Sequence, residues 1–453
     1  MDERKFKWVW WFGGGLVLLL ILLGANLLLD ESAPDLTGLL PDEAKGKVAE
    51  EISPQRQQEW MRWAEQLDEG RRALFRTGKL TPEQVRAAEW WDWLSAEECA
   101  AFLQRIPEEF WPTWETVARE GVPEQTLSGL DPHYLRMIAE GVQVNAKEAL
   151  LRKDWRLAAQ RVEELLLVPR NLMWHGNLQR YDMDREFKWA GMVFLRALVR
   201  TEGIPVEVLR RLRERLDAVK ISEEEMKQAL KRDFAHQLVW NDVEKTWEKK
   251  MDAVENDYPR TGPNFTFKNF RWAVFPRVLK SAPRSMLYKP HATQRLAAGF
   301  YRELLLLEKA SFQDVELIRK NMIEVVWGNG FWRRLSLENF IGKIVAAESL
   351  AIALDKRQWH LALLSRLEAA EAALALREYE MARGNLPESL EELVPEYLPA
   401  VPVDRTDGNS VRYAKRLRAV WIVGEENLRE PPEERGGVEV ERNVFRLPPL
   451  KAE

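Results

Sequence analysis

The chain contains a single cysteine and none of the common catalytic signatures. Cys99 is the only cysteine in 453 residues, so an internal disulfide and a zinc site built from cysteines are excluded. HExxH, GxSxG, SxxK, Walker A and GxGxxG patterns are also missing, and the five histidines are scattered. We therefore predict no catalytic residue, no cofactor and no metal ligand from the sequence.

A positive net charge is missing as well. The formal charge is −5, and acidic and basic residues are mixed along the chain, so the sequence offers no broad basic surface. We expect no nucleic-acid partner.

One feature that the sequence does contain is a long uncharged run. Residues 8–29 include no charged side chain and would form a helix of roughly 33 Å at 1.5 Å per residue, enough to cross a bilayer. The flanking charges are basic before the run and acidic after it: Arg4, Lys5 and Lys7, then Asp30, Glu31 and Asp35. The positive-inside rule then predicts a single-pass protein with a cytoplasmic N-terminus and an extracytoplasmic body.

Aromatic residues support a resident span. Trp8, Trp10 and Trp11 lie where an interfacial belt is expected, so we assign them to the membrane interface. The alternative is a cleaved signal peptide with Ala25 at the cut, although the apolar run continues beyond that residue.

The body of the chain has the pattern of a helical protein. Residues 30–52 are rich in proline, glycine and acids and are predicted to be a linker. Residues 53–338 contain helix-sized runs with start signals, such as Ser95 before two glutamates, and apolar residues spaced by three and four. Runs such as 146–168 and 185–202 predict paired helices. We expect an irregular α-helical array with solenoid-like hairpins.

The last part of the chain changes character. Residues 339–383 lack proline and predict one long connecting helix that ends near a glycine. Residues 384–453 contain short turns and strand-like runs, which predict a small α+β lobe. The predicted fold class is mainly α, with a transmembrane helix at the N-terminus.

An aromatic and basic stretch, residues 256–291, interrupts the helical pattern. We expect it to be a long crossing that docks on its own domain, with contact to lipid or to a partner as the alternative. The residues that would form this surface are Phe265, Phe267, Phe270, Arg271, Trp272 and Phe275.

Residues 370–424 carry a motif with a recognisable order. Its members are Gly384, Pro387, Pro402, Asp404, Asp407, Gly408 and Tyr413. The order resembles the C-terminal lobe of the major pseudopilins of type II secretion, in which a long helix ends in a glycine–proline turn and an aspartate-containing segment leads into a small sheet. A broader group of bacterial membrane-anchored proteins, which have a helical middle region like residues 143–240 and no assigned activity, shares this arrangement. The resemblance implies an inner-membrane protein with a periplasmic body.

The chain also departs from the pseudopilin pattern. Its N-terminus lacks the glycine and the FTxxE sequence of the pseudopilin leader, so processing as a pilin is not expected. The loop that binds calcium in that family is replaced by GEENLREPPEERGG, with Glu425 and Glu426 at the nearest positions. Calcium binding is therefore not expected, and Asp404, Asp407 and Gly408 are interpreted as a turn.

These observations lead to two functional hypotheses. The first is a non-catalytic, membrane-anchored scaffold that binds the lipid bilayer through residues 8–29 and a protein partner in the cell envelope, within a secretion or pilus-like assembly. The second is an anchored envelope hydrolase that uses a carboxylate pair in a helical groove, such as Glu163 or Glu164 against Asp182 or Asp184.

Overall fold

The structure, a computed structural model, describes residues 31–40, 54–81, 90–120, 132–173, 181–235, 238, 288–307, 311–327, 339–424 and 443–449. These ranges contain eleven α-helices and one three-stranded sheet, so the prediction of a mainly α-helical fold with a small sheet is confirmed. The predicted anchor, residues 8–29, lies outside them. Among the helices that the structure describes, none is both long and apolar enough to span a membrane.

The chain forms two compact units. Unit 1 comprises Met1–Asp42, Leu230–Glu308 and Asp314–Asp355, and unit 2 comprises Glu43–Ala229, Lys309–Gln313 and Lys356–Glu453. The boundary falls inside α19 (Phe340–Arg383), which closely matches the helix predicted over 339–383. The C-terminal lobe shares unit 2 with the helices that begin at Pro54.

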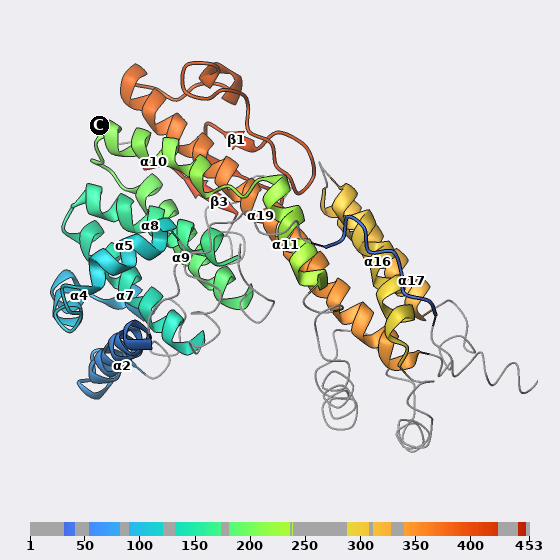
Figure 1. The fold of residues 1–453 in the computed structure, drawn as a ribbon. Helices are drawn as coiled ribbons and strands as arrows, with labels where there is room; N and C mark the ends of the chain where they lie inside the picture. The colour runs from blue at the N-terminus through green and yellow to red at the C-terminus, as the bar shows by residue number, and fades with distance from the viewer. Residues whose placement is uncertain are drawn as a thin grey trace, which may run out of the picture. The chain divides into compact units, whose positions relative to one another are not determined.

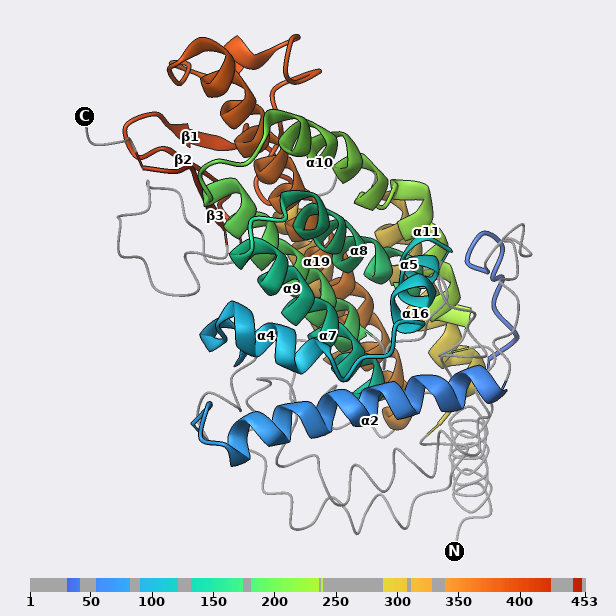
Figure 2. The ribbon, with the colours of Figure 1, turned by 90° about the vertical axis from the view of Figure 1, so that its left-hand side faces the viewer.

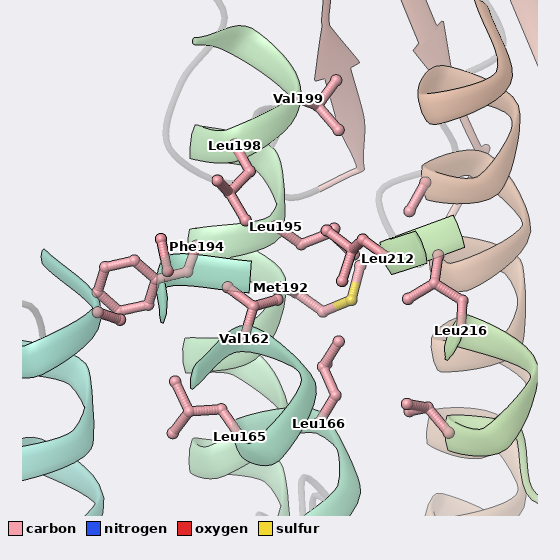
Figure 3. Close-up of a cluster of buried hydrophobic side chains, with 14 of the residues drawn as sticks. Val162, Leu165, Leu166, Met192, Phe194, Leu195, Leu198, Val199, Leu212 and Leu216 are labelled. Atoms are coloured by element: carbon pink, nitrogen blue, oxygen red, sulfur yellow. The ribbon is translucent and has the colours of Figure 1, made fainter. Parts of the chain in front are cut away.

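Unit 2 is built around α8, which packs against α5, α7, α9 and α10. The helices of this unit are α2 (Pro54–Arg76), α4 (Ala96–Leu103), α5 (Phe110–Glu120), α7 (Pro132–Leu151), α8 (Trp155–Met173), α9 (Tyr181–Arg200) and α10 (Val206–Val219), with the 3-10 turn η1 (Trp90–Trp93), most of α11 (Glu223–Phe234) and the part of α19 from Lys356 onward. Figure 3 shows side chains of α8, α9 and α10 gathered in one cluster, including the fully buried Val162, Leu165 and Leu195. Each such side chain contributes about 1.5–3 kcal/mol on burial.

A glycine allows α8 and α9 to approach closely. A Cβ atom placed on Gly191 of α9 would lie 2.7 Å from the Cγ and Cδ2 atoms of Leu166 on α8. No other residue type fits there without a shift of Leu166, so this position fixes the spacing of the two helices.

Of two helix predictions, the start at Ser95 is confirmed by the structure and the run over 146–168 is not. The predicted start at Ser95 is confirmed as a capping box, in which Ser95 and Glu98 each accept a hydrogen bond from the other's backbone N–H. The continuous helix predicted over 146–168 is wrong, because α7 ends at Leu151 and α8 begins at Trp155. Lys153 adopts a left-handed φ of 61°, and Asp154 accepts a bond of 3.1 Å from the N–H of Leu157, which starts the new helix.

The C-terminal lobe packs on the helices of unit 2. It contains η4 (Leu390–Leu393), β1 (Arg412–Ala414), β2 (Ala419–Trp421) and β3 (Val444–Arg446), and the strands pair antiparallel in that order. Leu393, Val420 and Phe445 are fully buried and belong to the same hydrophobic core as α8 and α9. β3 contacts α9, and Figure 2 shows the strands beside that helix. The lobe and the helices of this unit therefore share one hydrophobic core.

Unit 1 contains α16 (Pro290–Leu306), α17 (Phe312–Trp327) and the first part of α19. Tyr301 of α16 is fully buried; its ring contacts that of Phe234 at a centroid distance of 5.1 Å, and its hydroxyl donates to the carbonyl of Ser349 at 3.2 Å. Residues 31–40, part of the predicted linker, pack along α16 (Figure 1), and Leu39 is fully buried.

Candidate functional site

The pseudopilin-like motif begins at the turn that ends α19. Gly384 has a left-handed φ of 79°, and its N–H donates to the carbonyl of Glu380 at 2.8 Å, which closes the helix. The hydroxyl of Tyr413 on β1 donates to the carbonyl of Pro387 at 2.9 Å. Strand β1 is therefore joined to the turn that follows α19.

Asp404 is the centre of the motif and is completely buried. One carboxylate oxygen accepts from the N–H of Thr406 at 2.9 Å and from its hydroxyl at 2.5 Å. The other accepts from Arg412 and from the N–H of Val423, each at 2.7 Å. Four donors from three parts of the lobe thus converge on one side chain.

The backbone around Asp404 closes a tight turn. The N–H of Gly408, which has a φ of 78°, donates to the carbonyl of Asp404 at 2.8 Å. The carbonyl of the buried Pro402 accepts from the N–H of Val411 at 3.0 Å. The interpretation of the Asp-Gly segment as a turn agrees with this geometry.

Arg412 pairs with both aspartates of the motif. Its guanidinium contacts the carboxylates of Asp404 and Asp407. Burial favours a higher pKa for Asp407, but hydrogen bonds from Arg412 and Asn409 outweigh burial and lower this pKa below 3.8. Because the carboxylate oxygens of Asp404 are occupied by internal donors, this cluster organises the lobe.

The other predicted site residues cannot be placed. The interfacial tryptophans and the aromatic surface lie outside the described residues: Trp8, Trp10, Trp11, Phe265, Phe267, Phe270, Arg271, Trp272 and Phe275. The side chains of Asp182 and Asp184 lie outside the described part of the chain as well.

A buried carboxylate cluster, which sequence reasoning only partly found, joins α5 and α8. Glu164 is buried, and its carboxylate accepts from Arg161 at 2.9 and 2.7 Å and from the indole N–H of Trp114 at 3.0 Å. The amide of Gln160 donates to both Glu164 and Glu115 at 3.0 Å. The carboxylate near Glu164 is therefore Glu115, which the sequence did not single out.

The surroundings of Glu164 change its proton affinity. Burial raises the pKa of Glu164, and the nearby Glu115 acts in the same direction, whereas Arg161 and Gln160 oppose the rise. The side chain of Glu115 is 40% exposed, so only one member of the pair is shielded from water. Such an arrangement can separate the protonation behaviour of two neighbouring carboxyl groups.

A cleft of about 250 Å³ lies between α8 and α10. Gln160 and Glu163 line it from α8, and Glu207 and Arg211 line it from α10. Glu163 pairs with Arg215 of α10 at 3.6 Å, whereas Glu164 contacts Trp114 of α5. The two adjacent carboxylates therefore lie in different surroundings.

Ion pairs connect α10 with α19. Lys220 Nζ lies 2.8 Å from Glu371 and 3.5 Å from Glu368. Burial favours a lower pKa for Lys220, but the carboxylates outweigh burial and raise this pKa. Arg213 makes a similar contact of 2.7 Å with the buried Glu378. These charges hold two helices together.

The described residues offer little for metal or thiol chemistry. Within the ranges that the structure describes, no group of three or more His, Cys, Asp or Glu side chains could hold a metal ion. Cys99 is buried, and burial raises the pKa of its thiol to about 12. The thiol therefore stays protonated at neutral pH and is a weak nucleophile.

Comparison with known proteins identifies no relative. No protein family model, curated protein or solved structure matches this chain. A function must be inferred from its own residues.

Proposed function

We propose that this protein is a non-catalytic scaffold anchored in the bacterial inner membrane, with its body in the periplasm. Residues 8–29 would form the single membrane span, and the C-terminal lobe would bind a protein of the cell envelope within a secretion or pilus-like assembly. The uncharged N-terminal run and the order of the motif residues support this proposal.

The firm attachment of the lobe to the helices is the observation that carries the proposal. Arg366 of α19 donates to Asn443 at 3.0 Å, and Arg418 pairs with Glu380 of α19 at 2.8 Å. Together with the shared hydrophobic core, these bonds hold the lobe in one orientation on unit 2. A preorganised surface suits partner binding, because little conformational entropy is lost on association.

Among the described residues of the lobe and the end of α19, two large apolar side chains are exposed. Met381 is 49% exposed and Val403 is 38% exposed, and both lie next to the motif in sequence. Apolar side chains at the core of an interface contribute much of its stability, so these two positions are where we expect partner contact.

Photo-crosslinking in living cells tests the proposal. A photoreactive amino acid would replace Met381 or Val403, with Leu317 on α17, which is 57% exposed, as the matched control. We expect one envelope protein to be captured at the first two positions and not at the control. The same pattern at all three positions, or no capture, would count against a binding surface on the lobe.

Point substitutions are preferable to removal of the lobe. Deletion of residues 384–453 would test the lobe only if the helices of unit 2 folded without it. Leu390, Leu393 and Phe445 belong to the core of unit 2, so the deletion would expose that core to water. Loss of binding after deletion would then also reflect unfolding.

An anchored envelope hydrolase is the second candidate, and the Glu115–Glu164 pair is the observation that favours it. A carboxyl group with a raised pKa can act as a general acid, and a neighbouring exposed carboxylate can act as a base or nucleophile. Hydrolysis of purified peptidoglycan by the full chain would be compared with Glu164→Gln and Glu115→Gln, with Glu163→Gln as the control. Absence of hydrolysis, or equal rates in all variants, would dismiss this candidate.

A further inference from the structure

The segment that follows the uncharged run is fixed to α16. Arg295 of α16 contacts the carboxylate of Glu31 at 2.7 Å and donates to the carbonyl of Ser32 at 2.8 Å. Arg302 donates to the carbonyl of Asp35. Figures 1 and 2 both show residues 31–40 beside this helix. We call this segment the strap.

The strap has a defined direction. His291, in the first turn of α16, hydrogen bonds to the carbonyl of Glu31 at 2.9 Å, whereas Asp35 is bound by Arg302 near the other end. The strap therefore runs from the N-terminal end of α16 toward its C-terminal end, and Leu39 is buried farther along. Its start is fixed at the N-terminal end of the helix.

The distance from the uncharged run to the strap is short. Glu31 is the second residue after Leu29, and two extended residues span at most about 7 Å. A free linker over residues 30–52 would instead reach tens of ångströms. The N-terminal end of α16 must therefore lie close to the place where the uncharged run ends.

We infer that unit 1 turns the N-terminal end of α16 toward the bilayer surface and that the strap holds it there. This inference rests on the proposed function, because residues 8–29 must span the membrane. The partner of this surface is the lipid headgroup layer. Leu306, at the other end of α16, lies roughly 21 Å along the helix axis from Ala292, at 1.5 Å per residue, so in this orientation it lies farther from the headgroups than Ala292 does.

Fluorescence quenching in vesicles tests the orientation. The full chain would be reconstituted in phosphatidylcholine vesicles that contain a lipid with a nitroxide headgroup. A fluorophore would be attached at Ala292→Cys or at Leu306→Cys; the native Cys99 is buried and its thiol pKa is about 12, so it should not be labelled. We expect several-fold stronger quenching at position 292 than at 306. Equal quenching, or none at 292, would overturn the inference.

A charge reversal tests the strap itself. Arg295→Glu places a negative charge against Glu31 and removes the donor to the carbonyl of Ser32, so it should reduce the quenching at position 292 toward that at 306. Lys320→Glu, the same reversal at an exposed residue of α17, is the control and should leave the quenching unchanged. Quenching that survives Arg295→Glu would contradict the role of the strap.

Alkaline extraction separates failure of this inference from failure of the anchor. If carbonate releases the full chain from membranes, the anchor is wrong and the inference falls with it. If the chain stays in the membrane but position 292 is not quenched, the orientation alone is wrong.

Discussion

Replacement of Asp404 with alanine should disrupt the C-terminal lobe more than any other single change in the motif. The carboxylate is completely buried and accepts four hydrogen bonds, two of them from the backbone N–H groups of Thr406 and Val423. In Asp404→Ala, both N–H groups lose the carboxylate oxygen to which they donate. Water has little access to them, because Thr406 and Val423 are also buried.

The expected cost follows from these contacts. A buried donor without a partner costs about 1–3 kcal/mol, and removal of one member of a buried ion pair typically costs about 3–5 kcal/mol. The two costs are not added in full, because Arg412 keeps its contact with Asp407 in the variant and so does not become an unpaired charge. We expect Asp404→Ala to lower the free energy of unfolding by about 3–5 kcal/mol.

Hydrogen exchange and denaturant unfolding measure this effect. Peptides that cover residues 400–424 should lose amide protection in Asp404→Ala, whereas peptides from α2 should change less. Asp407→Ala is the control; its backbone donor, the N–H of Asn409, is exposed and can bind water, so we expect a cost of about 1 kcal/mol. The reasoning would be refuted if Asp404→Ala cost less than Asp407→Ala, or if protection over 400–424 did not change.

Three further predictions concern the helices of unit 2. Lys220→Met should lower the free energy of unfolding by about 3–5 kcal/mol, because Glu371 is buried and loses its cation; urea unfolding measures this. Gly191→Ala should cost about 1–3 kcal/mol in the same assay, because the new methyl group meets Leu166. Burial raises the pKa of Glu164 in the folded state, so folding favours its protonated form, and stability should fall as pH rises from 4.5 through the folded-state pKa. Glu164→Gln should flatten this slope, as unfolding curves at several pH values would show.

Matched variants control these predictions. Lys415→Met removes an ion pair whose acid, Glu388, is 80% exposed, and should cost under about 1 kcal/mol. Equal effects of Lys220→Met and Lys415→Met would show that burial does not determine the cost. Gly299→Ala on α16, where a Cβ meets nothing within 4 Å, is the control for Gly191→Ala. An unchanged pH slope in Glu164→Gln would contradict the raised pKa.

Local signals in the sequence predicted much of the helical architecture. The capping box at Ser95 depends only on neighbouring residues, so its pattern is visible in the chain. The long helix predicted over 339–383, observed as α19, lacks proline and is followed by Gly384. This glycine adopts the left-handed conformation that ends many helices. The order of the motif residues also indicated a compact turn, because Asp-Gly pairs favour it.

Features that depend on packing could not be predicted in the same way. The carboxylates of Glu115 and Glu164 meet only because α5 packs on α8, and no sequence spacing specifies that pair. The apolar pattern continues through the break between α7 and α8, where Asp154 was the only local signal. The sequence predicted a linker for the strap because residues 30–52 are rich in proline, glycine and acids, whereas its order comes from Arg295 and Arg302 about 260 residues later.

In-cell crosslinking of the full anchored chain, followed by detergent purification and mass spectrometry, tests the central claim most directly. The scaffold proposal predicts stoichiometric recovery of secretion or pilus-like components with the native chain. In Asp404→Ala, recovery should fall together with the amide protection of residues 400–424. Recovery of the protein alone, or of the same partners at unchanged levels from the Asp404→Ala variant, would contradict a binding role for the lobe.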